Sequence, residues 1–120
     1  MVKRKKYYKP LPDCLTIRES GISGLGLFAT QDIEGGKVLG LTHLYDWSFE
    51  DNYIRTPLGG FINHSETPNC ELEYTGDIDY HPWEERYTKK NTSHRRLVTI
   101  TKIPKGQELT AKYDIYDPTE

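Results

Sequence analysis

The chain has 120 residues, a formal net charge of −2, 35% hydrophobic residues and only two cysteines. A chain of this length forms one domain with a core of its own, without disulfide or zinc staples. Cys14 and Cys70 are too few for a disulfide framework or a structural zinc cluster, so we expect no bound metal. No apolar run reaches the roughly 18 residues that a membrane-spanning helix needs, which argues against a membrane protein.

The first residues of the chain are strongly basic. Five of the first nine residues are Lys or Arg, which leaves a net charge of −7 for the remainder. We interpret residues 1–12 as a basic N-terminal arm, followed by a single domain at residues 13–120. Such an arm is either solvated or in contact with an anionic partner such as a nucleic acid, and the sequence leaves both open.

The rest of the chain alternates short β-type segments with turns rich in glycine and proline. No window shows sustained helical periodicity, although a short helical turn fits within residues 47–57. Alternating and β-branched patterns predict strands at residues 15–17, 27–29, 38–45, 70–74, 97–101 and 108–113. We therefore predict a mostly β fold that is built from several small sheets.

A G-x-G pattern at Gly24–Gly26 stands directly before one of these strands. Glycines at such positions let the backbone approach a ligand closely or adopt a positive φ. The pattern is not a dinucleotide-binding fingerprint, because it lacks the preceding strand, the following helix and the third glycine. Taken alone, it fits an ordinary turn better than a ligand site.

Two further segments carry polar groups at unusual places. Residues Asn63–Ser65 follow the apolar pair Phe61–Ile62, and a buried amide needs hydrogen-bond partners. The last strand candidate ends at Tyr113, which by itself could be a packed aromatic residue. A structural polar network and a ligand site are both compatible with these segments when each is read alone.

Together and in this order, the three segments resemble the SET domain, over about residues 15–116. Residues Gly24–Ala29 are similar to the family pattern G-x-G-x-[FY]-A, and Asn63–Cys70 to N-H-S-x-x-P-N-C. The segment Gly106–Tyr113 is similar to G-x-E-L-T-x-x-Y. The small size resembles viral or bacterial members. Because the basic N-terminus lacks the apolar stretch of a secretory signal, we expect an intracellular protein, cytoplasmic or in a host nucleus, and not a secreted one.

The resemblance implies a fold, an activity and a set of site residues. The expected fold is a SET-domain fold of several small β-sheets with a threaded C-terminal segment, a pseudoknot. The expected activity is that of a protein-lysine N-methyltransferase, which uses S-adenosylmethionine (AdoMet). By carry-over, the catalytic residue is Tyr113, and the cofactor would be bound by Gly24, Leu25, Gly26, Asn63 and His64.

Departures from the family pattern raise further expectations. The cysteine-rich zinc modules of many members are missing, and only seven residues follow Tyr113. Tyr45, Tyr53 and Tyr116 are candidates for the aromatic lining of the lysine channel. Ala111 stands where members often carry a larger residue that restricts the number of methyl groups added, so a small side chain there suggests room for further methylation.

The expected partner is a protein or peptide substrate with a basic, lysine-containing tail, which resembles a histone tail. Contact with a second copy in a homodimer stays open, as does contact of the basic arm with nucleic acid. The alternative to an enzyme is a non-catalytic SET-like module that binds a peptide or AdoMet without turnover.

Overall fold

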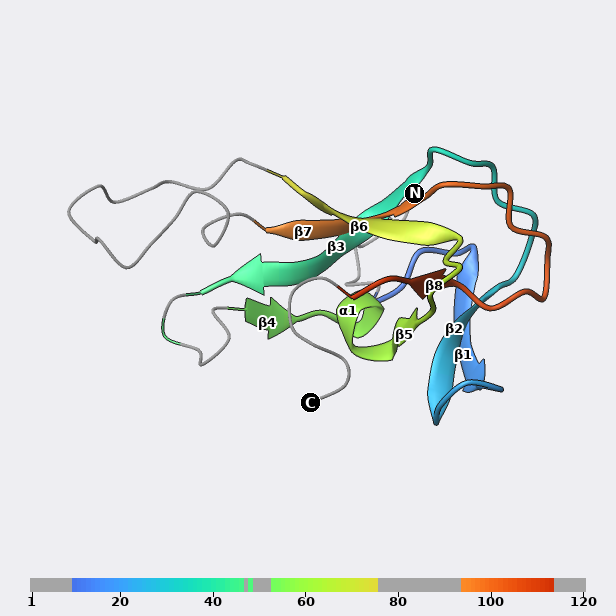
Figure 1. The fold of residues 1–120 in the computed structure, drawn as a ribbon, viewed down its shortest axis with the longest axis horizontal. Helices are drawn as coiled ribbons and strands as arrows, with labels where there is room; N and C mark the ends of the chain where they lie inside the picture. Colours follow the sequence, from blue (N-terminus) through green and yellow to red (C-terminus); the bar gives the residue numbers. More distant parts are fainter. Residues whose placement is uncertain (1–9, 47, 49–52, 76–93, 114–120) are drawn as a thin grey trace, which may run out of the picture.

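The computed structural model describes residues 10–46, 48, 53–75 and 94–113, and the fold is mostly β, as predicted (Figure 1). Strands β1 (Leu15–Glu19) and β2 (Leu25–Ala29) form a two-stranded antiparallel hairpin. The other strands form a sheet in the order β4-β3-β7-β6-β8-β5. They are β3 (Val38–Tyr45), β4 (Tyr53–Arg55), β5 (Asn63–His64), β6 (Cys70–Tyr74), β7 (Arg95–Thr99) and β8 (Thr110–Ala111).

The C-terminal strand occupies an unusual place in the larger sheet. Strand β8 lies between β5 and β6 and runs parallel to both. Residues 65–69 join β5 to β6, so this short connection has to cross β8. The C-terminal segment is thus inserted beneath an earlier loop, which is the threaded arrangement that the family resemblance implied.

The segment before β8 also joins the hairpin to the rest of the molecule. Phe28 and Glu108 form an antiparallel bridge, and the amide of Leu109 donates to the carbonyl of Leu27 at 2.8 Å. The amide of Ala29 donates to the carbonyl of Gln107 at 3.0 Å. Strand β2, which begins at Leu25 inside the G-x-G pattern, is therefore paired with the final sequence motif.

The core consists of aliphatic side chains from both sheets and from the helix α1 (Pro57–Phe61). Fully buried members include Leu27, Ile33, Ile62, Leu97, Ile103 and Leu109. The helix begins where Thr56 accepts a hydrogen bond from the amide of Gly59, with Pro57 in the first turn. A Cβ atom on Gly59 would collide with the carbonyl of Thr42 on β3, so glycine lets the helix pack closely.

Several predicted boundaries were wrong. The helical turn expected within residues 47–57 falls largely on residues 47 and 49–52, which lie outside the described ranges. Tyr53–Arg55 pair with β3, and a helix that was not predicted begins at Pro57. Strand β2 begins two residues earlier than predicted, and β7 spans Arg95–Thr99. The last strand contains only Thr110–Ala111, since the amide of Tyr113 bonds to a side chain instead of a neighbouring strand.

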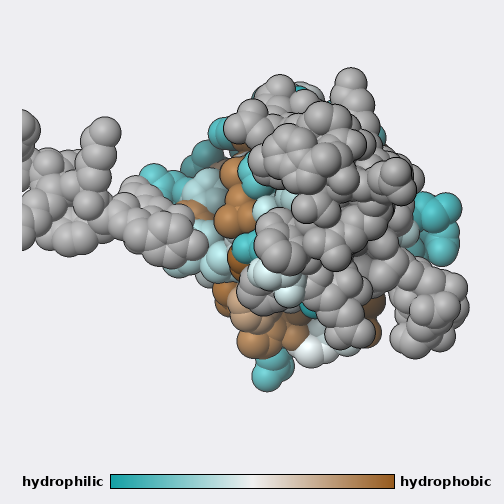
Figure 2. Space-filling model, turned by 90° about the vertical axis from the view of Figure 1, so that its left-hand side faces the viewer, coloured by the Kyte–Doolittle hydropathy of each residue, from teal (hydrophilic) through white to brown (hydrophobic). Residues whose placement is uncertain are grey.

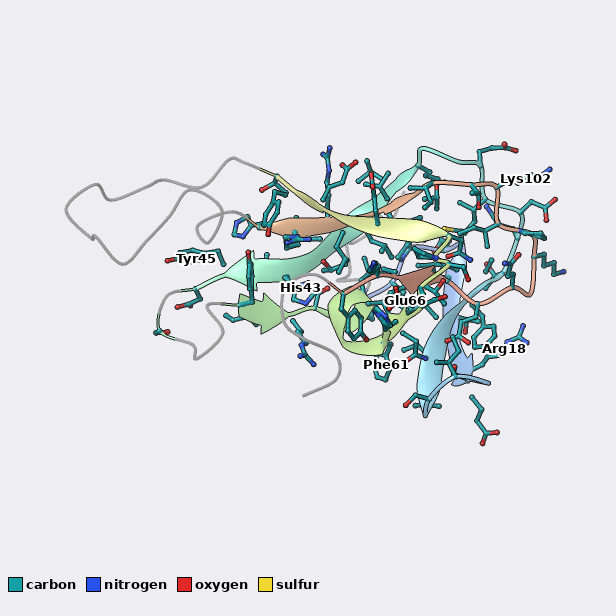
Figure 3. The ribbon with its side chains drawn as sticks, in the orientation of Figure 1. Arg18, His43, Tyr45, Phe61, Glu66 and Lys102 are labelled. Carbon is teal, nitrogen blue, oxygen red and sulfur yellow. The ribbon has the colours of Figure 1, made fainter. Side chains whose placement is uncertain are left out.

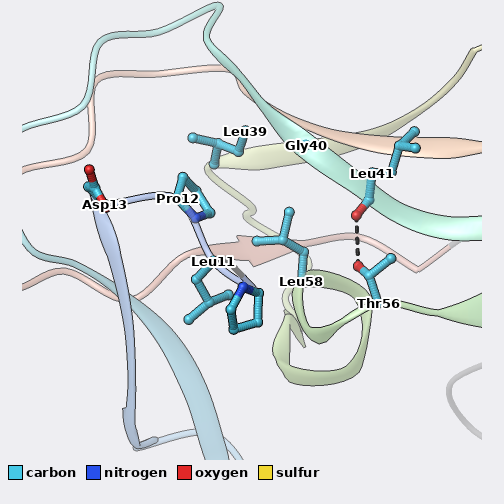
Figure 4. Close-up of a pocket in the computed structure, with 9 residues that line it drawn as sticks. Leu11, Pro12, Asp13, Leu39, Gly40, Leu41, Thr56 and Leu58 are labelled. Carbon is cyan, nitrogen blue, oxygen red and sulfur yellow. Dashed lines mark hydrogen bonds between the residues drawn. The ribbon is translucent and has the colours of Figure 1, made fainter. Parts of the chain in front are cut away.

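The last residues of the predicted basic arm contact the domain. Leu11 packs against the core, and the amide of Leu15 donates to the carbonyl of Pro12. A cavity of about 520 Å³ lies between this segment, β3 and the start of α1, beside the hydrogen bond from Thr56 to the carbonyl of Leu41 (Figure 4).

Some apolar side chains stay on the surface. Figure 2 shows a band of apolar surface between hydrophilic side chains on one face of the molecule. Among the residues that the structure describes, six large apolar side chains are exposed, namely those of Ile22, Leu25, Val38, Leu41, Tyr74 and Ile100. Within the described ranges, no helix has the length and apolar character that crossing a membrane requires.

Two leucines on β2 provide a test of this packing. Leu27 is 0% exposed and Leu25 is 47% exposed. We expect Leu27→Ala to lower the free energy of unfolding by about 2–5 kcal/mol, because it leaves a cavity in the core. Leu25→Ala should change it by less than about 1 kcal/mol. Urea unfolding of both variants checks this, and equal losses would contradict the described burial.

Candidate functional site

The three motifs that lie far apart in the sequence meet around β5 and β8. Asn63 pairs with Thr110, and His64 pairs with Ala111. This register places the Asn63-His64 dipeptide alongside the final motif. Ala111, the partner of His64, is two residues before Tyr113. The sequence correctly predicted that these segments come together.

Tyr113 is held against the Asn63-His64 dipeptide by three contacts. Its amide donates to Nδ1 of His64 at 2.9 Å, and the two rings meet edge to face with centroids 5.1 Å apart. Its hydroxyl donates to the carbonyl of Ile62 at 2.6 Å. Both ends of the Tyr113 side chain are therefore fixed relative to β5.

These contacts determine which nitrogen of His64 carries a proton. Because Nδ1 accepts from the amide of Tyr113, the proton of the neutral ring is on Nε2, which lies 3.2 Å from a carboxylate oxygen of Glu66. Glu66 also pairs with Lys112 at 3.3 Å. The hydrogen bond from His64, followed by the contacts with Lys112, lowers the pKa of Glu66.

The loop at residues 23–26, which we call the glycine loop, lies against the side chain of Asn63. The amide nitrogen Nδ2 of Asn63 is 3.1 Å from the carbonyl oxygen of Ser23 and 3.3 Å from that of Leu25. Gly24 has a φ of +48°, in the left-handed region that favours glycine, and no heavy atom lies within 4 Å of where its Cβ would be. The predicted cofactor residues 24, 25 and 63 thus form one continuous surface.

Two residues that contact the side chain of Asn63, Ser20 and Glu108, were missed by the sequence analysis. Ser20 and Glu108 bond to each other at 2.8 Å, and Nδ2 of Asn63 lies 3.0 Å from Ser20 Oγ and 2.8 Å from Glu108 Oε2. Glu108 stands in the recognised G-x-E-L-T segment, but only the fold shows which groups its carboxylate contacts. Ser20 belongs to a turn that carried no signal of its own.

Two of the predicted channel residues, Tyr45 and Tyr53, lie away from β5 and β8, whereas Ala111 belongs to β8 and pairs with His64. Tyr45 and Tyr53 face each other across β3 and β4, with ring centroids 6.4 Å apart. These strands are at the opposite end of the strand order from β8 and β5, and Figure 3 shows Tyr45 at the end of β3. Ala111 is fully buried, and Tyr116 lies outside the described residues.

Tyr113 also borders a cavity of about 300 Å³. Its lining combines apolar and charged side chains, namely Pro68, Cys70, Glu71, Leu72, Ile100, Lys112 and Tyr113. The hydrogen bond between Glu71 and Glu73 raises the pKa of Glu71, as expected for two neighbouring carboxyl groups. Glu73 is in turn paired with Arg96 at 3.1 Å, and Glu71 shares the cavity lining with Lys112, so groups of both charges lie on this side of the site.

Comparisons with known proteins agree with this arrangement. The sequence profile of the SET domain matches residues 42–114. A Plasmodium falciparum chain described as a histone methyltransferase has a TM-score of 0.61 at 17% identity, covering 91% of this chain and 99% of its own. A chain of apo ctPRC2 with mutations in Ezh2 has a TM-score of 0.58 at 18% identity. That alignment covers 87% of the present chain and 15% of the ctPRC2 chain.

Because the two sequence identities are only 17% and 18%, these structural likenesses show the fold and nothing beyond it. No curated protein sequence matches this chain significantly.

The thiol of Cys70 offers a test of how tightly the site is packed. Cys70 is 0% exposed between Thr99 and Ala111, and burial raises the pKa of its thiol from 9.0 to about 12. A raised pKa stabilises the fold below pH 9, and this contribution is lost as the pH rises towards 12.

We expect iodoacetamide at pH 8 to modify Cys70 in the native protein at least about a hundredfold more slowly than in urea, because the thiolate is the reactive form. Peptide mapping by mass spectrometry separates Cys70 from Cys14. Equal rates in the native and unfolded protein would show that β6 and β8 do not enclose the thiol.

Proposed function

Because the chain belongs to the SET-domain family, we propose that it is a protein-lysine N-methyltransferase. It would transfer the methyl group of AdoMet to the ε-amine of a lysine in a protein or a basic peptide. The observation that carries the proposal is the convergence of three separate segments. Tyr113 contacts His64, and the neighbouring Asn63 contacts the glycine loop.

The residues around Asn63 suit AdoMet. The loop at residues 23–25 presents main-chain groups, and open space surrounds the position of a Cβ on Gly24. Nδ2 of Asn63 is bonded within the protein, so its Oδ1 faces the other way and can accept a hydrogen bond from a ligand. We therefore assign cofactor binding to Gly24, Leu25, Asn63 and His64, with Gly26 behind them. When bound, AdoMet supplies an electrophilic methyl group on a sulfonium sulfur.

The chemical difficulty is to deprotonate and align the lysine amine. At pH 7, forming the neutral amine from a group with a reference pKa of about 10.4 costs about 4.6 kcal/mol. Apolar surroundings and a nearby positive charge lower that pKa. Alignment of the two reactants then contributes most of the acceleration, since effective molarities reach about 10⁵ M or more.

Tyr113 is suited to align the amine and poorly suited to remove its proton. Its hydroxyl donates to the carbonyl of Ile62, so the phenol keeps its proton in this arrangement. The phenol oxygen still has lone pairs with which it can accept from an N–H of the lysine amine. A phenol with a reference pKa of about 10 is also a weak general base at neutral pH.

The charge around the site supports a basic substrate. Glu71 borders the cavity beside Tyr113, and the charge of Lys112 on that side is paired with Glu66. With Lys112 engaged in this way, the carboxylate of Glu71 can attract a positively charged, lysine-containing tail. The same proposal includes transfer of more than one methyl group, because the small side chain of Ala111 leaves room for a methylated amine. A homodimer and contact of the basic arm with nucleic acid stay predictions.

Replacement of the Tyr113 hydroxyl tests the proposal. In Tyr113→Phe we expect methyl transfer to fall at least about tenfold, because the oxygen that orients the amine is lost. The affinity for AdoMet should change by less than about twofold, and stability by about 0.5–1.5 kcal/mol from the lost bond to Ile62. The assay uses labelled AdoMet with a panel of histone-like basic peptides, read by mass spectrometry.

Tyr74→Phe on β6 is the matched control and should keep wild-type turnover. Normal turnover in Tyr113→Phe would remove Tyr113 from the catalytic role. If the wild-type protein binds AdoMet but methylates no peptide, the non-catalytic binding module becomes the better description.

A further inference from the structure

The carboxylate of Glu108 lies between Ser20 and Asn63, and these three side chains form what we call the cofactor-side cluster. Its Oε2 is 2.8 Å from Nδ2 of Asn63, and the hydroxyl of Ser20 lies 2.8 Å from each carboxylate oxygen. Glu108 is partly buried and reaches this place because the segment before β8 pairs with β2. The carboxylate thus links the glycine loop, β5 and the final motif.

The surroundings of Asn63 determine the orientation of its amide. Four oxygens lie within 3.3 Å of Nδ2, from the side chains of Ser20 and Glu108 and from the carbonyls of Ser23 and Leu25. An amide oxygen in that position would face these acceptors and be repelled, above all by the carboxylate. The nitrogen is therefore turned inward and Oδ1 is turned away from this group.

Ser20 couples this orientation to the shape of the loop. Its hydroxyl oxygen accepts from the amides of Ile22 at 2.9 Å and Ser23 at 3.3 Å. With those donors on the oxygen, the hydroxyl hydrogen is directed to Glu108. The same serine therefore orders residues 20–23 and supports the carboxylate.

Gly26 provides the space that this arrangement needs. Gly26 is buried, and a Cβ atom on it would collide with the carboxylate of Glu108 and lie 3.0 Å from Nδ2 of Asn63. The second glycine of the G-x-G pattern therefore makes room for a side chain of the protein itself. This differs from Gly24, which borders open space.

We propose that Glu108, supported by Ser20, is a positioning residue that fixes the Asn63 amide, so that Oδ1 accepts from the α-ammonium group of AdoMet. The inference rests on the proposed function. A carboxylate behind the amide favours a cationic donor on the other side. The α-ammonium group is the cationic hydrogen-bond donor of AdoMet, since its sulfonium carries no N–H or O–H.

Calorimetric titration with two ligands tests this role without any turnover. The probes are S-adenosylhomocysteine and its analogue in which hydrogen replaces the α-amino group. Wild-type protein should prefer S-adenosylhomocysteine by roughly tenfold or more, as a charge-assisted hydrogen bond predicts. In Glu108→Gln the preference should fall below about threefold, since glutamine can face either orientation of Asn63.

Two further variants separate this role from a general loss of stability. Ser20→Ala should also reduce the preference, whereas Glu34→Gln, at an exposed carboxylate outside the cluster, should keep it. Loss of overall stability would weaken both ligands equally and leave the ratio unchanged. The inference is overturned if Glu108→Gln and Ser20→Ala both keep the wild-type preference.

Nuclear magnetic resonance of the ligand-free wild-type protein gives a second readout. The side-chain amide protons of Asn63 should exchange with water at least about tenfold more slowly than those of the exposed Gln31. Equal exchange would overturn the fixed orientation, whatever the variants do. If the amide is fixed but the wild-type protein binds neither ligand, the proposed function fails and the role toward AdoMet fails with it.

Discussion

The architecture depends on one buried amide that holds the C-terminal segment between two earlier strands. Nδ2 of Asn69 donates to the carbonyl of Glu108 at 2.9 Å, and Oδ1 of Asn69 accepts from the amide of Thr110 at 2.8 Å. Asn69 is only 8% exposed, so its amide is satisfied by the inserted segment instead of water. These bonds act together with the pairing to β5 and β6 to hold β8, and with it the position of Tyr113 beside His64.

The two asparagines of the central motif therefore have different tasks. Asn69 is engaged on both ends of its amide by the backbone of the C-terminal segment, which is a structural role. Asn63 is engaged through its nitrogen by the glycine loop and Glu108, and it presents the other end of its amide outward. One polar motif thus supplies both a structural side chain and a side chain of the proposed ligand site.

The sequence predicted local strands well and distant contacts only through the family resemblance. The strand at Val38–Tyr45 has a clear β pattern and was placed correctly, whereas the helix at Pro57–Phe61 was not predicted, because its two glycines weaken a helical pattern. Glu108 and Ser20 are 88 residues apart, and no local pattern predicts their hydrogen bond. Strand β8 is short because its neighbours end the pairing, which the alternating sequence around it does not reveal.

The central claim is that the glycine loop, the Asn63-His64 dipeptide and Tyr113 form one ligand site. Its most direct test is a titration of isotope-labelled protein with S-adenosylhomocysteine, followed by nuclear magnetic resonance. The account predicts that the largest backbone shifts fall at residues 20–26, 63–64 and 111–113. Saturable binding with shifts confined to the cavity lined by Leu11, Leu39 and Leu58 would contradict it.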